Sequence, residues 1–378
     1  MKKPVMAKRA TQRGLILATV AMAIVTAGCA GPPRDACDMA GTPGTVCGFE
    51  NPEDIELIDS SGVVLVSNLR LGDPLPGGGF LSAMTTAGAT GDDQQARPWK
   101  AWPLEDGSAP AADNSSALLG SPDCPGPPDP AAFNPHGISS TSSGALALLY
   151  VVAHVVEGSG REAIEIFAVV GSGLETKLTW LGCIPTPDAI QANDLAVSAN
   201  GSVYASNYQP DNSPMHMIKA SLLGTDTGGI IAWKPGTGWS EIEGTTSKLA
   251  NGVALSKDGK VLYYTETISR SLHRKPLDGS PSVWVDIPGM PDNLSWTERG
   301  TLLVASHTSG PRFMACAIGR LPCRSPWIVQ ELDPTTMALR TLSEHDGDRL
   351  GAVATATPAG DKILLGSVFD DRIGVLSD

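Results

Sequence analysis

The stretch Asn-Asp-Leu-Ala-Val-Ser-Ala-Asn-Gly-Ser-Val-Tyr-Ala-Ser-Asn, residues 193–207, decides the fold because variants of it recur along the chain. Leu195 and Val197 alternate with small or polar residues, which is the pattern of a β-strand. An Asn-Gly pair at residues 200–201 supplies a tight turn, and a second apolar segment follows it. The stretch therefore predicts a β-hairpin preceded by a pair of polar residues.

Five further copies of this hairpin occur in the sequence. Two clear copies start at Asp54 and Gly252, and looser copies start at Gly137, Asn293 and Ala352. Neighbouring copies start roughly 41 to 83 residues apart, which suits a four-stranded propeller blade with loop insertions. We therefore predict an all-β chain that folds as a six-bladed β-propeller. A β-sandwich is the alternative, but a sandwich has no reason to repeat the polar pair.

The N-terminal segment has the layout of a secretory signal. Residues 1–28 carry five basic residues and no acidic one, and residues 15–27 form an apolar run that is too short to span a membrane. The run ends in Thr-Ala-Gly-Cys, which resembles a bacterial lipoprotein signal with lipidation at Cys29. The alternative is an ordinary signal peptide cleaved at Ala27 or Ala30. Either way we expect an exported protein, and the lipoprotein reading places it in the bacterial cell envelope, anchored to a membrane.

This reading divides the chain into a signal peptide (residues 1–28), a tether with a candidate closing strand (residues 29–52) and one propeller domain (residues 53–378). The formal net charge of the whole chain is −13, and removal of the signal makes the chain more acidic still. Such a balance argues against nucleic acid as a partner. It suits solubility and the binding of divalent cations.

Six cysteines remain after Cys29, an even number that indicates disulfides in an exported chain. Cys37 with Cys47 and Cys316 with Cys323 would close short loops, which leaves Cys124 with Cys183. Other pairings stay open, because spacing alone does not fix connectivity.

The polar pairs that precede the hairpins are the first candidate functional residues. A propeller places equivalent residues in a ring, with the innermost strands around a central channel. The pairs should therefore converge there; they are Glu53-Asp54, Pro135-His136, Asn193-Asp194, Ala250-Asn251, Asp292-Asn293 and Gly351. Carboxylate and amide oxygens without thiolates suit Ca²⁺, with Mg²⁺ as the alternative. Each residue taken alone would more often be a turn cap, but five correlated positions favour a metal.

Histidines form the second candidate set. His154 and His307 end apolar runs, and both should lie near the same channel mouth as His136 because an antiparallel hairpin returns toward its origin. Each could be a structural histidine, but together beside a cation they indicate catalysis. His216, His273 and His345 lie in polar context and are expected at the surface. The motifs of serine hydrolases, phosphate-binding loops and zinc proteases do not occur in the sequence.

The heptad Phe-Asn-Pro-His-Gly-Ile-Ser at residues 133–139, followed in matching order by Asn-Asp-Leu, Ala-Asn-Gly, Asp-Asn-Leu and Leu-Leu-Gly-Ser-Val-Phe, resembles the paraoxonase (arylesterase) family. The similarity runs from Glu53 to the end of the sequence. The heptad is specific to that family, whereas the Asn-Asp and Asp-Asn pairs also fit the wider gluconolactonase-like propellers. The resemblance implies a six-bladed propeller with two calcium ions in its channel and hydrolysis of lactones, often accompanied by aryl-ester hydrolysis.

The resemblance also implies individual roles. The catalytic calcium would be held by Glu53, Asn193, Asn251, Asp292 and Asn293. A deeper, structural calcium would be held by Asp54, Asp194 and the backbone carbonyl of Ile138. His136 supported by His154 matches the general-base pair, and His307 matches a further active-site histidine.

Two departures from the family affect these expectations. The family closes its ring with a disulfide to a cysteine near the C-terminus that this sequence lacks, so hydrogen bonds or other disulfides are expected to close it here. Residues 208–229 lie where the family carries a lid over the active site. Met215, Ile218 and Leu222 have helical spacing there, but the lid differs in sequence and leaves substrate choice open.

The leading hypothesis is a calcium-dependent lactonase with promiscuous aryl-esterase activity, acting on acyl-homoserine or other hydrophobic lactones. One alternative is a non-catalytic envelope propeller that binds a peptide or glycan and uses calcium only for stability. Another is a sugar lactonase, which would favour a polar pocket without an apolar lid. The partners expected are thus a small lactone or ester and, through Cys29, a membrane; the oligomeric state is left undetermined.

Overall fold

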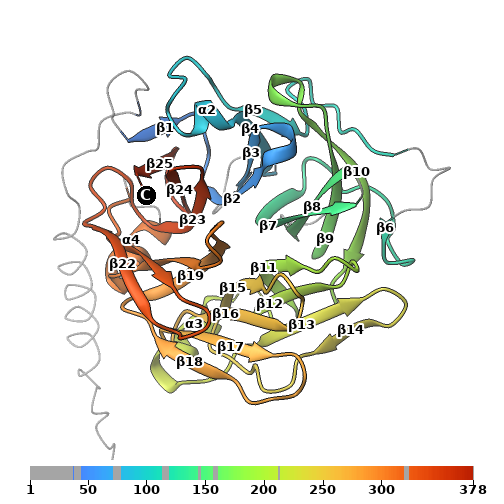
Figure 1. The fold of residues 1–378 in the computed structure, drawn as a ribbon. Helices are drawn as coiled ribbons and strands as arrows, with labels where there is room; N and C mark the ends of the chain where they lie inside the picture. The colour runs from blue at the N-terminus through green and yellow to red at the C-terminus, as the bar shows by residue number, and fades with distance from the viewer. Residues whose placement is uncertain are drawn as a thin grey trace, which may run out of the picture.

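A computed structural model describes residues 37, 44–70, 78–112, 119–143, 146–155, 161–211, 213–318 and 323–377 of the chain. The predicted signal segment and Cys29 lie outside these residues. Six sheets, antiparallel except for one short parallel strand, are arranged around a common centre like the blades of a propeller (Figure 1). The six-bladed β-propeller predicted from the repeat is therefore confirmed. None of the helices in the described ranges has both the length and the apolar character needed to cross a bilayer.

The first three blades follow the chain in order. Blade 1 contains β2 (Pro52–Ile58), β3 (Val63–Asn68), β4 (Phe80–Thr85) and β5 (Trp99–Trp102). Blade 2 contains β7 (Phe133–Ser143), β8 (Leu146–Val155), β9 (Ala163–Val170), β10 (Lys177–Pro185) and the short parallel strand β6 (Leu119–Gly120). Blade 3 contains β11 (Gln191–Val197), β12 (Val203–Gln209), β13 (Gly229–Lys234) and β14 (Gly238–Glu241).

The remaining blades complete the ring. Blade 4 contains β15 (Ala250–Leu255), β16 (Val261–Glu266), β17 (Ser271–Pro276) and β18 (Val283–Asp286). Blade 5 contains β19 (Met290–Trp296), β20 (Leu302–His307), β21 (Trp327–Leu332) and β22 (Leu339–His345). Blade 6 contains β23 (Val353–Ala359), β24 (Lys362–Ser367), β25 (Arg372–Ser377) and β1 (Thr45–Cys47). Helical segments in the connections are η1 (Asp59–Ser61), α2 (Thr86–Ala89), η2 (Gly173–Glu175), α3 (Pro214–Leu223) and α4 (Gly310–Ala317).

The hairpin at residues 193–207 forms as its sequence predicts, with Val197 opposite Val203 across the turn. Asn200 Oδ1 accepts hydrogen bonds from the Ser202 amide (3.0 Å) and the Ser198 hydroxyl (2.5 Å). Gly201 has φ +80°, a left-handed conformation that a glycine adopts without strain. The turn thus follows from local chemistry, and it fixes the register of the two strands.

Apolar side chains pack between neighbouring blades, so both faces of each blade are buried. Along β11, Leu195 packs toward blade 2, whereas its neighbour Ala196 packs toward blade 4. Six such clusters occupy the six interfaces between blades. The alternation that indicated strands therefore supplies the cores that hold the ring together.

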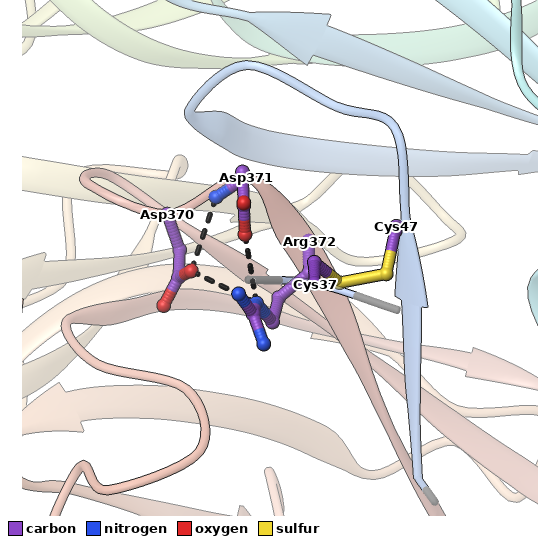
Figure 2. The surroundings of a disulfide bond; sticks show 5 residues. All are labelled: Cys37, Cys47, Asp370, Asp371 and Arg372. Atoms are coloured by element: carbon purple, nitrogen blue, oxygen red, sulfur yellow. Dashed lines mark hydrogen bonds and ion pairs between the residues drawn. A yellow bond between two sulfur atoms is a disulfide. The ribbon is translucent and has the colours of Figure 1, made fainter. Parts of the chain in front are cut away.

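Blade 6 is completed by strands from both ends of the described chain. β1 pairs antiparallel with β25 (Figure 1), and Cys47 lies opposite Arg372 in this pairing. Figure 2 shows Arg372 beside the Cys37–Cys47 disulfide, with its guanidinium Nε 3.2 Å from Asp370 Oδ1 and 2.8 Å from Asp371 Oδ1. The ring is thus closed by backbone hydrogen bonds rather than by a disulfide to the C-terminal strand.

The structure contains the three disulfides that the short-loop pairing favoured, namely Cys37–Cys47, Cys124–Cys183 and Cys316–Cys323. It also forms a helix, α3, where the spacing of Met215, Ile218 and Leu222 suggested one; all three side chains are exposed.

The expectation that His273 lies at the surface is wrong. His273 is opposite Tyr264 on one neighbouring strand and opposite Trp284 on the other. Its ring stacks on both rings, with centroids 4.6 Å and 6.1 Å away. These cross-strand contacts leave only 15% of the side chain exposed.

Candidate metal and catalytic site

The predicted ligands lie at irregularities in the innermost strands, not in front of them. In β7, β11, β15 and β19, two residues face a single residue of the partner strand, which is a β-bulge. The bulged pairs are His136-Gly137, Asn193-Asp194, Asn251-Gly252 and Asp292-Asn293. In β2 the extra residue is Glu53. The polar pair of each repeat therefore forms a β-bulge. Bulges often occur next to functional sites, where they change the direction in which a side chain points.

The glycines in these bulges are required by close approach to the next blade. A Cβ at Gly252 would lie 2.5 Å from the Asp292 carbonyl oxygen. A Cβ at Gly137 would lie 2.6 Å from Asp194 Cα. The bulges of neighbouring blades thus pack directly against one another, which brings their polar side chains into one region.

Four of the predicted ligands present buried oxygens that have no hydrogen-bond partner. The atoms are Glu53 Oε2, Asn193 Oδ1, Asn251 Oδ1 and Asn293 Oδ1. Their other polar atoms have partners: Asn293 Nδ2 donates to Glu53 Oε1 (2.9 Å), and Asn251 Nδ2 donates to Thr267 Oγ1 (3.3 Å). Asn193 Nδ2 faces His136 Nε2 at 3.5 Å. In each amide the nitrogen therefore has a partner and the oxygen has none. A buried oxygen without a hydrogen bond destabilises the folded state unless another group, such as a cation, binds it.

These contacts bridge the channel. The Asn293–Glu53 hydrogen bond joins blade 5 to blade 1, which are not neighbours in the ring. His136 Nε2 lies 3.5 Å from Glu53 Oε1, so blade 2 joins the same group. Across the described ranges, no three side chains drawn from His, Cys, Asp and Glu alone form a metal-binding group. The oxygens found here are mostly amides, a donor set that fits a hard cation such as Ca²⁺.

The ligands assigned to the deeper ion form a second, adjoining layer. Asp54 accepts hydrogen bonds from the Ile55 and Ile138 amides at 2.9 and 2.8 Å. Asp194 accepts from the Leu195 and Val253 amides, both at 2.7 Å. Burial raises the pKa of both carboxyls well above the usual value, and nearby carboxylates raise it further, Glu53 for Asp54 and Asp54 for Asp194. A cation between such groups would offset both costs.

A cavity of about 450 Å³ continues the channel on the far side of Asp54 and Asp194. It is lined by the second halves of all six innermost strands and includes Glu56, whose Oε1 accepts from the Ser140 amide at 2.9 Å. The two carboxylates therefore lie between this cavity and the layer formed by Glu53 and the asparagines.

The structure brings His136 and His154 together. His136 Nδ1 lies 2.9 Å from His154 Nε2, across the β7–β8 pair. Burial alone would lower the pKa of His136, but the charges of Glu53, Asp292 and Asp54 outweigh it and raise the pKa. A cation bound to the same carboxylates would oppose that increase.

His307 contacts Asp292. Its Nε2 is 2.8 Å from Asp292 Oδ2, and its ring packs on Phe313 with centroids 4.3 Å apart. These contacts place it against a predicted ligand. Its assignment as a catalytic residue stays a prediction.

Two residues of the site were not predicted from the sequence. Glu162 Oε2 lies 2.7 Å from His154 Nδ1 and extends the histidine pair to three residues. Tyr208, near the end of β12, has its pKa raised by burial and by the Asp292 carboxylate, so its phenol stays protonated. Tyr208 follows directly after the repeated hairpin, which was the one available signal. Glu162 has no counterpart in the other copies of the repeat.

Comparisons with known proteins show which proteins this chain is similar to. The model of the family described as SMP-30/Gluconolactonase/LRE-like region matches residues 161–312. Serum paraoxonase/arylesterase 1 of Mus musculus is 25% identical over 247 residues, which cover 64% of this chain and 68% of the mouse protein. Protein STRICTOSIDINE SYNTHASE-LIKE 13 of Arabidopsis thaliana is 28% identical over 192 residues, 48% of this chain and 45% of the plant protein. The chain thus spans less than half the length of that relative.

Among solved structures, a luciferin-regenerating enzyme superimposes with a TM-score of 0.51 at 13% identity, covering 87% of this chain and 91% of the enzyme. At that identity the likeness concerns the fold alone. The resemblance predicted from residues 133–139 is confirmed: this chain is similar to the paraoxonase/arylesterases and to the wider group of gluconolactonase-like propellers.

Proposed function

We propose that this chain is a calcium-dependent hydrolase that opens lactones and also hydrolyses aryl esters. The observation that carries the proposal is the group of four buried, unpartnered oxygens next to the paired rings of His136 and His154. A non-catalytic propeller, in which a cation only stabilises the fold, needs the oxygens to bind that cation. It does not need a pair of histidines beside the cation. The names of the similar proteins, which include arylesterase and gluconolactonase, point to the same class of reaction.

The residues present fit two cations. Glu53, Asn193, Asn251, Asp292 and Asn293 would hold the ion on the histidine side, and Asp54, Asp194 and the Ile138 carbonyl would hold the deeper one. When bound, a calcium ion at the first position supplies Lewis acidity toward the carbonyl oxygen of the substrate.

The chain's own residues supply the base. His136 Nε2 points toward Glu53 and Asn193, at 3.5 Å from each, and is placed to take a proton from an attacking water. The water oxygen then adds to the lactone carbonyl carbon, and the ring C–O bond breaks. The proton held by His136 passes to the departing alkoxide, which becomes the hydroxyl of a hydroxy acid. The reaction thus consumes one water and leaves the enzyme unchanged.

Apolar side chains favour a hydrophobic lactone as substrate over a sugar lactone. α3 leaves β12 at the same end of blade 3 as Asn193, and α4 follows the strand that ends at His307. Both helices carry exposed apolar residues; these are Met215, Ile218 and Leu222 on α3 and Met314 on α4. An acyl chain could contact such a surface.

A lactone panel with and without a chelator tests the proposal. We expect the purified protein in calcium to hydrolyse acyl-homoserine or other hydrophobic lactones faster than a sugar lactone, and to lose this activity when calcium is removed. Turnover measured by acid release gives the result directly. Inactivity of folded, calcium-loaded protein on the whole panel would contradict the lactonase proposal and favour a non-catalytic propeller.

We also propose that the mature chain is exported and anchored through Cys29. Cys29→Ala should move the protein from the membrane to the soluble fraction with its lactonase activity retained, because the repeats begin only at Glu53. Fractionation followed by an immunoblot measures the change. A Cys29→Ala protein that is processed yet stays in the membrane fraction would show that the anchor lies elsewhere.

A further inference from the structure

Glu162, His154 and His136 form a line of hydrogen-bonding groups that leads away from the channel. Glu162 Oε2 is 2.7 Å from His154 Nδ1, and His154 Nε2 is 2.9 Å from His136 Nδ1. His136 Nε2 then faces Glu53 and Asn193 across the channel. Both ring nitrogens of each histidine thus have a neighbour, and the carboxylate stands at the outer end.

The carboxylate determines where the hydrogens of both rings reside. An ionised carboxylate only accepts hydrogen bonds, so His154 Nδ1 must carry a hydrogen and donate it to Glu162. The neutral His154 ring then has a lone pair on Nε2, which accepts from His136 Nδ1–H. The remaining nitrogen, His136 Nε2, is left without a hydrogen, which is the state that a general base requires. Asn193 Nδ2, a donor 3.5 Å away, favours an acceptor at this position, whereas Glu53 Oε1 at the same distance favours a hydrogen there. A cation bound to Glu53 would engage that carboxylate and leave Asn193 as the neighbour that decides.

Packing alone does not fix the His154 ring. A cavity of about 290 Å³ borders it, with Phe133, Ala153 and Arg161 among the other lining residues. Glu162 itself is well placed to hold the ring, because its carbonyl accepts hydrogen bonds from the amide (3.0 Å) and hydroxyl (3.1 Å) of Thr186. Its backbone is thereby fixed just before β9 independently of its side chain.

We propose that Glu162 is a positioning residue, which holds His154 in the tautomer that leaves His136 Nε2 free to accept a proton. The inference rests on the proposed lactonase function for its catalytic consequence, but the tautomer can be measured without any substrate. The Glu162 carboxylate contacts the His154 ring, so its expected effect on turnover passes through the two rings.

The test compares Glu162→Leu, which removes the acceptor, with Glu162→Asp, which retains a carboxylate. Glu175→Gln, an exposed change outside the site, is the matched control. In the calcium-loaded protein, nitrogen-15 NMR of the histidine rings reports the tautomers, with His154→Gln identifying the signals of the pair. We expect Nδ1–H tautomers at both rings in the original protein and in the control, and a mixture in Glu162→Leu.

In the lactone assay, Glu162→Leu should lower kcat by about 10- to 100-fold, the range found when a partner that orients a metal-binding histidine is removed. KM and calcium affinity should stay unchanged, and Glu162→Asp should recover part of the loss. Unchanged tautomers and kcat in Glu162→Leu would overturn the proposal, and so would altered tautomers with unchanged kcat. If the original protein hydrolyses no lactone, the proposed function fails, while the NMR comparison still decides whether Glu162 sets the tautomer.

Discussion

His136→Gln should lower lactone turnover by about 10²- to 10⁴-fold, the loss expected when a general base is removed. The imidazole Nε2 lies 3.5 Å from Glu53 Oε1 and 3.5 Å from Asn193 Nδ2, beside the oxygens expected to bind calcium. Glutamine can still form a hydrogen bond with His154, but its amide takes up no proton near neutral pH. Steady-state kinetics at saturating calcium measures the change. Aryl-ester hydrolysis should fall less, because a good leaving group requires less help from a base.

The control separates loss of the base from loss of structure. His345→Gln removes an exposed histidine that stacks on Trp327 in blade 5, away from the channel, and should leave turnover unchanged. Melting temperature and calcium content of His136→Gln should match the original protein. Full turnover in a folded, calcium-loaded His136→Gln protein would remove His136 from the mechanism.

Asp194→Ala should abolish most of the stabilisation that calcium gives the fold. Asp194 is buried beside Asp54, and its carboxylate also accepts the Val253 amide of the next blade at 2.7 Å. A ligand that binds only the folded state stabilises it by about 4 kcal/mol at a thousandfold excess over Kd. Calcium should therefore raise the melting temperature of the original protein by a large amount, relative to the chelated protein, and that of Asp194→Ala by a small amount. Thermal unfolding at a series of calcium concentrations measures it.

Asn251→Ala and Asn293→Ala give the contrasting result if there are two ions. Each removes a neutral oxygen on the histidine side, so turnover should fall while most of the calcium-dependent stability remains. Asp361→Ala, which removes an exposed carboxylate, is the control for charge and should change neither quantity. Equal proportional losses of stability and activity in all three channel variants would show that a single structural ion is the simpler account.

Much of the fold could be predicted because it depends on local, repeated chemistry. Two such features depend only on residues that are close together in the sequence. They are the Asn-Gly turn at residues 200–201 and the alternation of Leu195 and Ala196 between the two faces of the blade. The bulges could not be predicted, because a bulge is a mismatch between two strands and its position depends on the register of the pair. The sequence showed the polar pairs, and the structure shows why they turn into the channel.

The predictions that were wrong or missing concern contacts between residues on different strands. His273 has polar neighbours in the sequence, but Tyr264 and Trp284 on the adjacent strands bury it. Glu162 contacts His154 although it belongs to no repeated motif, so only the folded blade reveals it. In contrast, His136 and His154 could be paired from the sequence, because they lie on the two strands of one predicted hairpin.

The closure of blade 6 has a consequence for the order of folding and for the route of unfolding. Blades 1 to 5 are built from strands that lie close together in the chain, whereas β1 pairs with β25, which lies more than 300 residues further along (Thr45 opposite Gly374). Ring closure is therefore the step with the highest contact order and should be slow.

The pairing of β1 with β25, here called the seam, is not crossed by a covalent bond in the described part of the chain. Both cysteines of the Cys37–Cys47 disulfide lie on the N-terminal side of this pairing (Figure 2). β25 is held by backbone hydrogen bonds and by the packing of Val46 and Ile373. The oxidised protein can thus separate β1 from β25 without breaking any of the three disulfides found in the described residues. We therefore expect the rate of unfolding to depend on how fast β1 and β25 separate. The lifetime of the native state is then set at the seam rather than in the five blades built from consecutive strands.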